Sequence, residues 1–257
     1  MGGKKKQRWD AKRAQLIIPK IALMMVWVFA VTIVSQYIVG YLMIWILGRE
    51  TFIQAVWTAV YSALAYTLAM VLVIFVPKKI TIENEGREKK KLIFKPGASR
   101  VGLGLRGLPT WTDIGLAPAG FIVYLLLASE LVALFSLLPW FNVEEVQQLN
   151  FSVMSVGVDR IVAFITLVVI APIAEEVIFR GWLYGKMREE LGMIVSIFLV
   201  SVLFGLVHLQ WNVGVNVFAM SIVLCGLREV TGTIYAGILL HMLKNGVAFY
   251  LLYVLGI

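Results

Sequence analysis

The chain has 257 residues, 60% of them hydrophobic and 15% charged. A soluble globular protein is nearer half apolar, so the composition favours a membrane-embedded bundle over soluble domains. The formal net charge of +8 does not indicate a nucleic-acid partner, because the basic residues form two blocks outside the apolar segments, where they act as topology signals and contact lipid. The single cysteine, Cys225, excludes an internal disulfide.

Seven apolar segments are candidates to cross a bilayer, which takes about 20 residues each. The predicted fold class is therefore all-α, a polytopic membrane bundle of about seven helices. Six or eight remain open, because the later segments are short or interrupted. The segments lie near residues 17–47, 52–76, 114–138, 158–187, 192–209, 213–228 and 233–254.

The chain is expected to form one membrane domain in three parts. Residues 1–16 form a basic cytoplasmic tail, residues 17–113 contain two membrane helices and a basic cytoplasmic loop, and residues 114–257 form the bundle that carries the functional motifs. Within the basic loop, "ITIE" and "KLIF" flank a charged, glycine-containing centre. This pattern predicts a small β-hairpin.

The distribution of lysine and arginine predicts the orientation of the helices. Residues 1–20 and the loop 77–113 are rich in both, whereas the loop 139–154 has neither. The positive-inside rule places both basic blocks in the cytoplasm and the loop 139–154 outside. The protein is thus expected to be an integral membrane protein with a cytoplasmic N-terminus, and the short, plain architecture favours a prokaryotic plasma membrane.

Both histidines of the chain fall at predicted membrane depth, where polar groups are costly and usually functional. Each is followed four residues later by an asparagine: His208 by Asn212, and His241 by Asn245. Residues at i and i+4 share a helix face. Two helices are therefore each expected to present a histidine and an amide at one spot.

Three charged residues share the predicted helix 158–187. Glu176 and Arg180 are at i and i+4, in the favoured acid-before-base order, which predicts a structural ion pair. The side chain of Glu175 points about 100° away, with no cation on its own face, and is free to act as a general base. If this helix and 192–209 form a hairpin that turns near residue 191, Glu175 and His208 meet at the same depth. They could then hold and deprotonate a water.

Three segments follow one another along the C-terminal half. They are "EEVIFR" from Glu175, "FGLVH" from Phe204 followed by Asn212, and "HMLKN" from His241, and they read EExxxR, FxxxHxxxN and HxxxN. Together they resemble the motifs of the CAAX prenyl protease and bacteriocin-processing family, the type II CAAX endopeptidases and their Abi relatives, which are glutamate intramembrane proteases. The resemblance covers roughly residues 155–250.

The resemblance implies an intramembrane endopeptidase without a metal or other cofactor. Glu175 and His208 would activate a water for attack on a peptide carbonyl. His241 and Asn245 would stabilise the oxyanion, and Asn212 would complete the polar wall. The implied partners are the lipid bilayer and a peptide or prenylated-protein substrate, whose C-terminal tripeptide is removed. The residues in supporting positions are Glu176, Arg180 and Phe204.

Three other functions are alternatives to this one. Two histidines and a glutamate match the zinc ligand set of a thermolysin-type metalloprotease, but there is no HExxH, and ligation by Glu175 would consume the obvious base. A non-catalytic role in bacteriocin immunity or scaffolding, attributed to some relatives, would tolerate loss of Glu175. A proton-coupled carrier is disfavoured, because no inverted repeat is visible.

Overall fold

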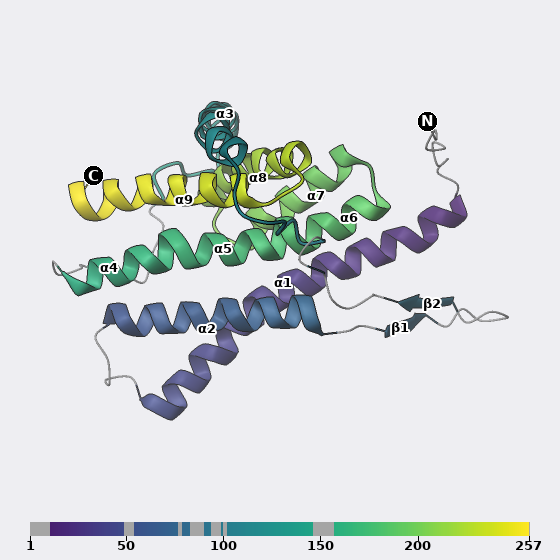
Figure 1. Ribbon diagram of the computed structural model, residues 1–257, viewed down its shortest axis with the longest axis horizontal. Helices are drawn as coiled ribbons and strands as arrows, with labels where there is room; N and C mark the ends of the chain where they lie inside the picture. Colours follow the sequence, from purple (N-terminus) through teal and green to yellow (C-terminus); the bar gives the residue numbers. More distant parts are fainter. Residues whose placement is uncertain are drawn as a thin grey trace.

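The structure is a computed structural model that describes residues 11–48, 54–76, 79–82, 90–93, 99, 102–145 and 157–256. Most of the predicted N-terminal tail and part of the predicted outer loop 139–154 lie outside these residues. Helix α1 (Ala11–Leu47) begins within the polar segment that was assigned to the tail, and it packs against α2 (Gln54–Phe75) (Figure 1).

Within the described residues, six helical stretches are long and apolar enough to span a membrane. A seventh apolar helix, α7 (Met193–Leu206), is shorter. The prediction of an all-α bundle of about seven membrane helices is thereby confirmed. The six long stretches are Ile17–Ile46, Val56–Phe75, Trp111–Phe135, Arg160–Glu190, Trp211–Thr231 and Tyr235–Leu255.

The fourth stretch is one continuous helix whose hydrogen-bonding pattern changes along its length. Two π-helical segments flank a short α-helical one, and π-helical turns occur frequently at functional sites. At its end the chain turns at Leu191 and Gly192 into α7, and the two helices pack together as the predicted hairpin. The segments are α4 (Val158–Phe164), η1 (Ile165–Ile170), α5 (Ala171–Glu176), η2 (Val177–Tyr184) and α6 (Gly185–Glu190).

The last two helices complete the bundle. Helix α8 (Trp211–Thr231) packs on α7, and α9 (Tyr235–Tyr250) continues into the π-helical η3 (Leu251–Leu255). Helix α3 (Trp111–Phe135) lies across α8 and α9 (Figure 1).

The predicted β-hairpin is present between α2 and α3. Strands β1 (Lys79–Ile82) and β2 (Lys90–Ile93) pair antiparallel, with Lys79 opposite Ile93 and Ile82 opposite Lys90. The hairpin projects from the same end of the bundle as the α6–α7 turn (Figure 1).

The segment that leads into α3 is fastened to the end of α8. The Arg228 guanidinium donates to the carbonyls of Gly102 and Leu103, both at 2.9 Å, and the Ile234 amide donates to the Gly104 carbonyl at 3.1 Å. Gly104 has φ +74°, and a Cβ at this position would collide with the Arg228 side chain. Only glycine therefore combines this backbone conformation with the approach of the arginine.

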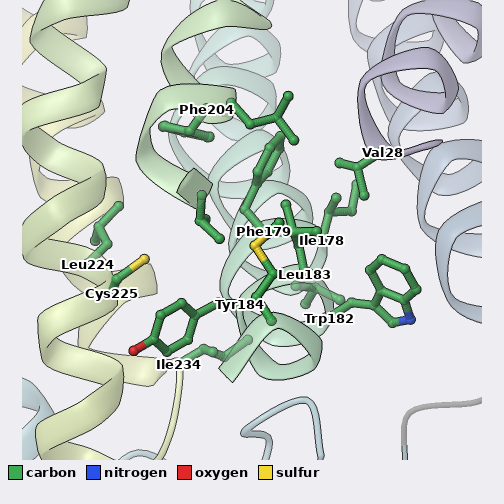
Figure 2. Packing of buried hydrophobic residues seen from close by; sticks show 14 of the residues in the cluster. Val28, Ile178, Phe179, Trp182, Leu183, Tyr184, Phe204, Leu224, Cys225 and Ile234 are labelled. Carbon is green, nitrogen blue, oxygen red and sulfur yellow. The ribbon is translucent and has the colours of Figure 1, made fainter. Parts of the chain in front are cut away.

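The main hydrophobic core surrounds η2, whose eight residues are all buried. Figure 2 shows Phe179 and Leu183 of η2 among Val28 of α1, Phe204 of α7 and Leu224 of α8. The helix that carries the paired glutamates is therefore held by packing directly after them, which fixes the position of the two carboxylates.

Candidate active site

A cavity of about 220 Å³ lies between α2, the η1–α5 segment, the start of α8 and the α9–η3 helix. It brings together ionisable residues that lie at membrane depth in the second half of the chain. Four of the five residues predicted to be catalytic line it: Glu175, His208, His241 and Asn245. Its other polar lining residues are Tyr66, Lys244 and Tyr253.

A hydrogen bond holds one of the two oxygens of the Glu175 carboxylate. The Tyr66 hydroxyl donates to Oε1 at 2.6 Å, and Oε2 lies 3.8 Å from Nε2 of His241. About 16% of the Glu175 side chain is exposed, and this exposure is to the cavity. The second oxygen is thus available to a molecule inside it.

Glu176 faces away from the cavity into a fully buried polar cluster. Its Oε1 accepts from Arg180 Nη1 at 2.8 Å and from His241 Nδ1 at 3.0 Å. The predicted Glu176–Arg180 ion pair is therefore present, and it also orients a histidine. Gly237 of α9 permits this approach, because a Cβ there would lie only 3.2 Å from Glu176 Oε2.

Phe204 connects the buried cluster to the cavity. The Arg180 guanidinium carbon lies 4.2 Å from the Phe204 ring centroid, a cation–π distance. The Phe179 and His208 rings stand edge-on to the same ring, at 4.9 and 5.1 Å between centroids. Phe204 therefore packs simultaneously against the ion pair and one of the cavity histidines.

The hydrogen bonds of the two histidines define their tautomers. Nδ1 of His208 lies 2.8 Å from the Phe204 carbonyl oxygen, and Nδ1 of His241 is bonded to the Glu176 carboxylate. Carbonyl and carboxylate oxygens only accept, so both Nδ1 atoms carry a proton. This leaves both Nε2 atoms for contacts within the cavity.

The two asparagines differ in position. Asn245 follows His241 by one turn of α9, lines the cavity, and donates from Nδ2 to the Leu167 carbonyl at 2.9 Å. Asn212 is not among the residues that line the cavity. Its Nδ2 donates to the Glu145 carbonyl at 2.6 Å.

The expectation that His208 and Asn212 share a helix face is wrong. Helix α7 ends at Leu206 and α8 begins at Trp211, so the two residues lie on either side of a turn. Leu209, within this turn, has φ +56°, which is incompatible with a continuous α-helix. The i to i+4 rule does not apply across such a break.

The cavity lies toward one end of the bundle. Its lining residues come from the second half of the α9–η3 helix, the start of α8 and the turn that carries His208. The α6–α7 and α8–α9 turns close the opposite end, where the β-hairpin also projects.

Three polar residues of the cavity, Tyr66, Lys244 and Tyr253, were not assigned to the site from the sequence. Tyr66 belongs to α2, in a long apolar run with no motif, and only the tertiary fold brings it to Glu175. Lys244 carried a detectable signal, a cation at membrane depth within the HxxxN motif, but the sequence did not indicate what it faces.

Within the described part of the chain, no group of three histidine, cysteine, aspartate or glutamate side chains converges in a manner that could hold a metal ion. The polar groups of the cavity instead form separate contacts, with Glu175 bonded to tyrosine and His241 bonded to Glu176.

Fold and site together define a helical membrane protein with carboxylate, imidazole and amide groups in a cavity at membrane depth. Residues 157–247 match the family model described as Rce1-like, type II CAAX prenyl endopeptidase. The matched segment contains all three motifs, in agreement with the resemblance seen in the sequence, so this part of the chain is similar to CAAX-type membrane peptidases. Helices α1, α2 and α3 precede the matched segment. Comparison with curated proteins and with solved structures gives no match.

Proposed function

We propose that the protein hydrolyses a peptide bond within the membrane, using a water activated by Glu175 and His208. The observation that carries this proposal is the convergence of Glu175, His208, His241 and Asn245 in one cavity. The four come from three separate parts of the fold, and a purely structural role would not require them to share an open space.

Glu175 and His208 have the free atoms that activation of a water requires. Tyr66 fixes Oε1 of Glu175, and the Phe204 carbonyl fixes Nδ1 of His208, so Oε2 and Nε2 both accept hydrogen bonds. A water held by these two acceptors loses a proton to one of them as its oxygen attacks the carbonyl carbon. The same proton then passes to the leaving amide nitrogen as the carbon–nitrogen bond breaks.

Asn245 and His241 are the proposed donors to the oxyanion. The Asn245 amide has two hydrogens and gives one to the Leu167 carbonyl, which leaves the other for the substrate. His241 commits Nδ1 to Glu176, so it donates to the oxyanion when Nε2 is also protonated. A donor of this kind is typically worth about 2.7–4 kcal/mol of transition-state stabilisation.

The proposed reaction uses no metal, and the zinc mechanism is its alternative. As a zinc ligand, Glu175 would no longer be available as the base. The remaining candidate, Glu176, is fully buried and already accepts from Arg180 and His241. The division of labour between the two glutamates therefore supports Glu175 as the base.

The proposed substrate is a prenylated protein or peptide with a CAAX-type C-terminus. A second, apolar groove of about 510 Å³ lies between the end of α3, α7 and α8, and it is lined by residues on both sides of His208 in sequence, including Gly205, Leu206 and Leu209. Its size falls within the range of small-molecule sites, roughly 300–1,000 Å³. A lipid chain in this groove would lie beside the turn that carries His208.

We further propose that the basic segments face the cytoplasm of a prokaryotic plasma membrane. Under the positive-inside rule, the end of the bundle with the β-hairpin is then cytoplasmic, because strands β1 and β2, which belong to the basic loop, lie there. The cavity lies toward the other end.

The substrate class is tested with purified protein in proteoliposomes and two peptides of one CAAX-type sequence, one farnesylated and one not. Mass spectrometry should detect release of the C-terminal tripeptide from the farnesylated form. Cleavage elsewhere, or equal cleavage of both peptides, would contradict the prenylated substrate class. A wild-type protein that is folded but inactive would favour the immunity or scaffolding function.

A further inference from the structure

Lys244 is a cation in the cavity, and no direct partner for it is found among the described residues. It belongs to α9, near the middle of the membrane-spanning stretch Tyr235–Leu255, and its side chain lines the same cavity as Glu175. With respect to the described residues, it makes no hydrogen bond and no ion pair within 4 Å. An unpaired lysine at this depth is costly, and such residues are usually functional.

The two glutamates near Lys244, Glu175 and Glu176, make their direct contacts with other residues. Glu176 is bonded to Arg180 and His241 inside the buried cluster. Glu175 attracts Lys244 electrostatically across the cavity, but its closest contacts are with Tyr66 and His241. The ammonium group is thus left facing open space, where an anionic ligand would complete its interactions.

The size of the cavity favours the end of a chain over an internal segment. Its volume of about 220 Å³ is below the roughly 300–1,000 Å³ of sites that enclose a drug-sized ligand. The end of a chain needs less space than an internal segment, and a C-terminal end carries a carboxylate.

The position of Lys244 along α9 suits such a terminus. Lys244 and His241 are at i and i+3 on one helix face, about 4.5 Å apart along the axis. Three extended residues reach at most about 10–11 Å from the bond that is cleaved. The long, flexible lysine stem lets the ammonium meet a carboxylate at that range.

We infer that Lys244 binds the C-terminal carboxylate of the substrate, so that the protein selects peptides with a free chain end a few residues beyond the cleaved bond. The inference rests on the proposed peptidase function. It assigns Lys244 a binding role, distinct from that of the groups proposed to activate water or hold the oxyanion.

The test compares two farnesylated peptides that differ only at the C-terminus, one a free acid and one an amide. Wild type should cleave the acid roughly 10- to 100-fold more efficiently in kcat/KM, the range of a charged hydrogen bond. Lys244→Met should lose this preference through a higher KM for the acid, with the amide unaffected. Lys244→Arg should keep most of the preference for the acid. Lys186→Met, outside the cavity, is the matched control and should behave as wild type.

Two results overturn the inference while the peptidase function stands. One is equal cleavage of acid and amide by wild type, a result that does not depend on whether a variant folds. The other is an equal loss of kcat on both peptides in Lys244→Met, which would make Lys244 only a counter-ion of Glu175. Failure of wild type to cleave either peptide overturns the proposed function and the inference with it.

Discussion

Tyr66 of α2 donates a 2.6 Å hydrogen bond to Glu175 of α5, across 109 residues of sequence. The matched family segment begins only at residue 157, so this bond brings the N-terminal half of the chain into the site. One oxygen of Glu175 is thereby fixed, and the other faces the cavity. The first two helices thus contribute to the geometry of the proposed base.

Replacement of Tyr66 by phenylalanine should reduce kcat/KM by roughly 10- to 100-fold, because a hydrogen bond to a charged group is worth about 1.5–3 kcal/mol. The comparison is made on the farnesylated peptide in proteoliposomes. Tyr253→Phe is the matched control, since Tyr253 lines the same cavity without a hydrogen bond to Glu175. Equal effects of the two substitutions would show that the Tyr66 bond is not specific to the reaction.

The two asparagines of the motifs should not be equivalent. Asn245→Ala removes a proposed oxyanion donor and should lower kcat by about 100-fold or more. Asn212→Ala should change kcat by only a few-fold, because Asn212 bonds to the Glu145 backbone and does not line the cavity. The single-turnover rates of the two variants measure this difference. A larger loss for Asn212→Ala would mean that the turn at residues 207–210 rearranges when substrate binds.

The Glu176–Arg180 pair should behave as a buried structural unit. Arg180→Ala leaves a buried carboxylate without its cation and should lower the free energy of unfolding by roughly 3–5 kcal/mol. A Glu176→Leu, Arg180→Met double variant should recover much of this loss, because it leaves no buried charge in the pair. Denaturant unfolding of the detergent-solubilised protein provides the measurement. A double variant less stable than Arg180→Ala would contradict this interpretation.

Most of the fold was predictable because apolar runs, charge and breaks in the pattern are local properties. The seven helices, the turn at residues 191–192 and the β-hairpin all follow from them. The Glu176–Arg180 pair was also predictable, since one turn of helix suffices to define it. The turn between His208 and Asn212 could not be predicted, because "HLQWN" contains neither glycine nor proline to mark a break.

The contact between Tyr66 and Glu175 was likewise beyond sequence reasoning. It depends on how α2 packs against the fourth helical stretch, and no local periodicity encodes that packing. The partner of His241 was also missed. Sequence spacing placed Glu176 with Arg180, but only the fold brings α9 close enough for Glu176 to bind both.

The orientation can be tested with cysteine labelling, because the single native cysteine, Cys225, is buried and can be replaced by alanine. In that background, Leu209→Cys marks the turn beside His208, and Glu189→Cys marks the end of α6. Both positions are exposed. A membrane-impermeant maleimide should label Leu209→Cys in intact cells, and Glu189→Cys only after permeabilisation. The reverse pattern would place the cavity end of the bundle in the cytoplasm.

The central claim is that Glu175 is the base of a metal-free peptidase. Its most direct test is cleavage of a quenched, farnesylated CAAX peptide in proteoliposomes by wild type and Glu175→Gln, each with and without a zinc chelator. Wild type should cleave equally well under both conditions, and Glu175→Gln should be slower by about 10²–10⁴-fold, the range for a lost general base. Loss of wild-type cleavage in chelator, or undiminished cleavage by Glu175→Gln, would contradict the claim.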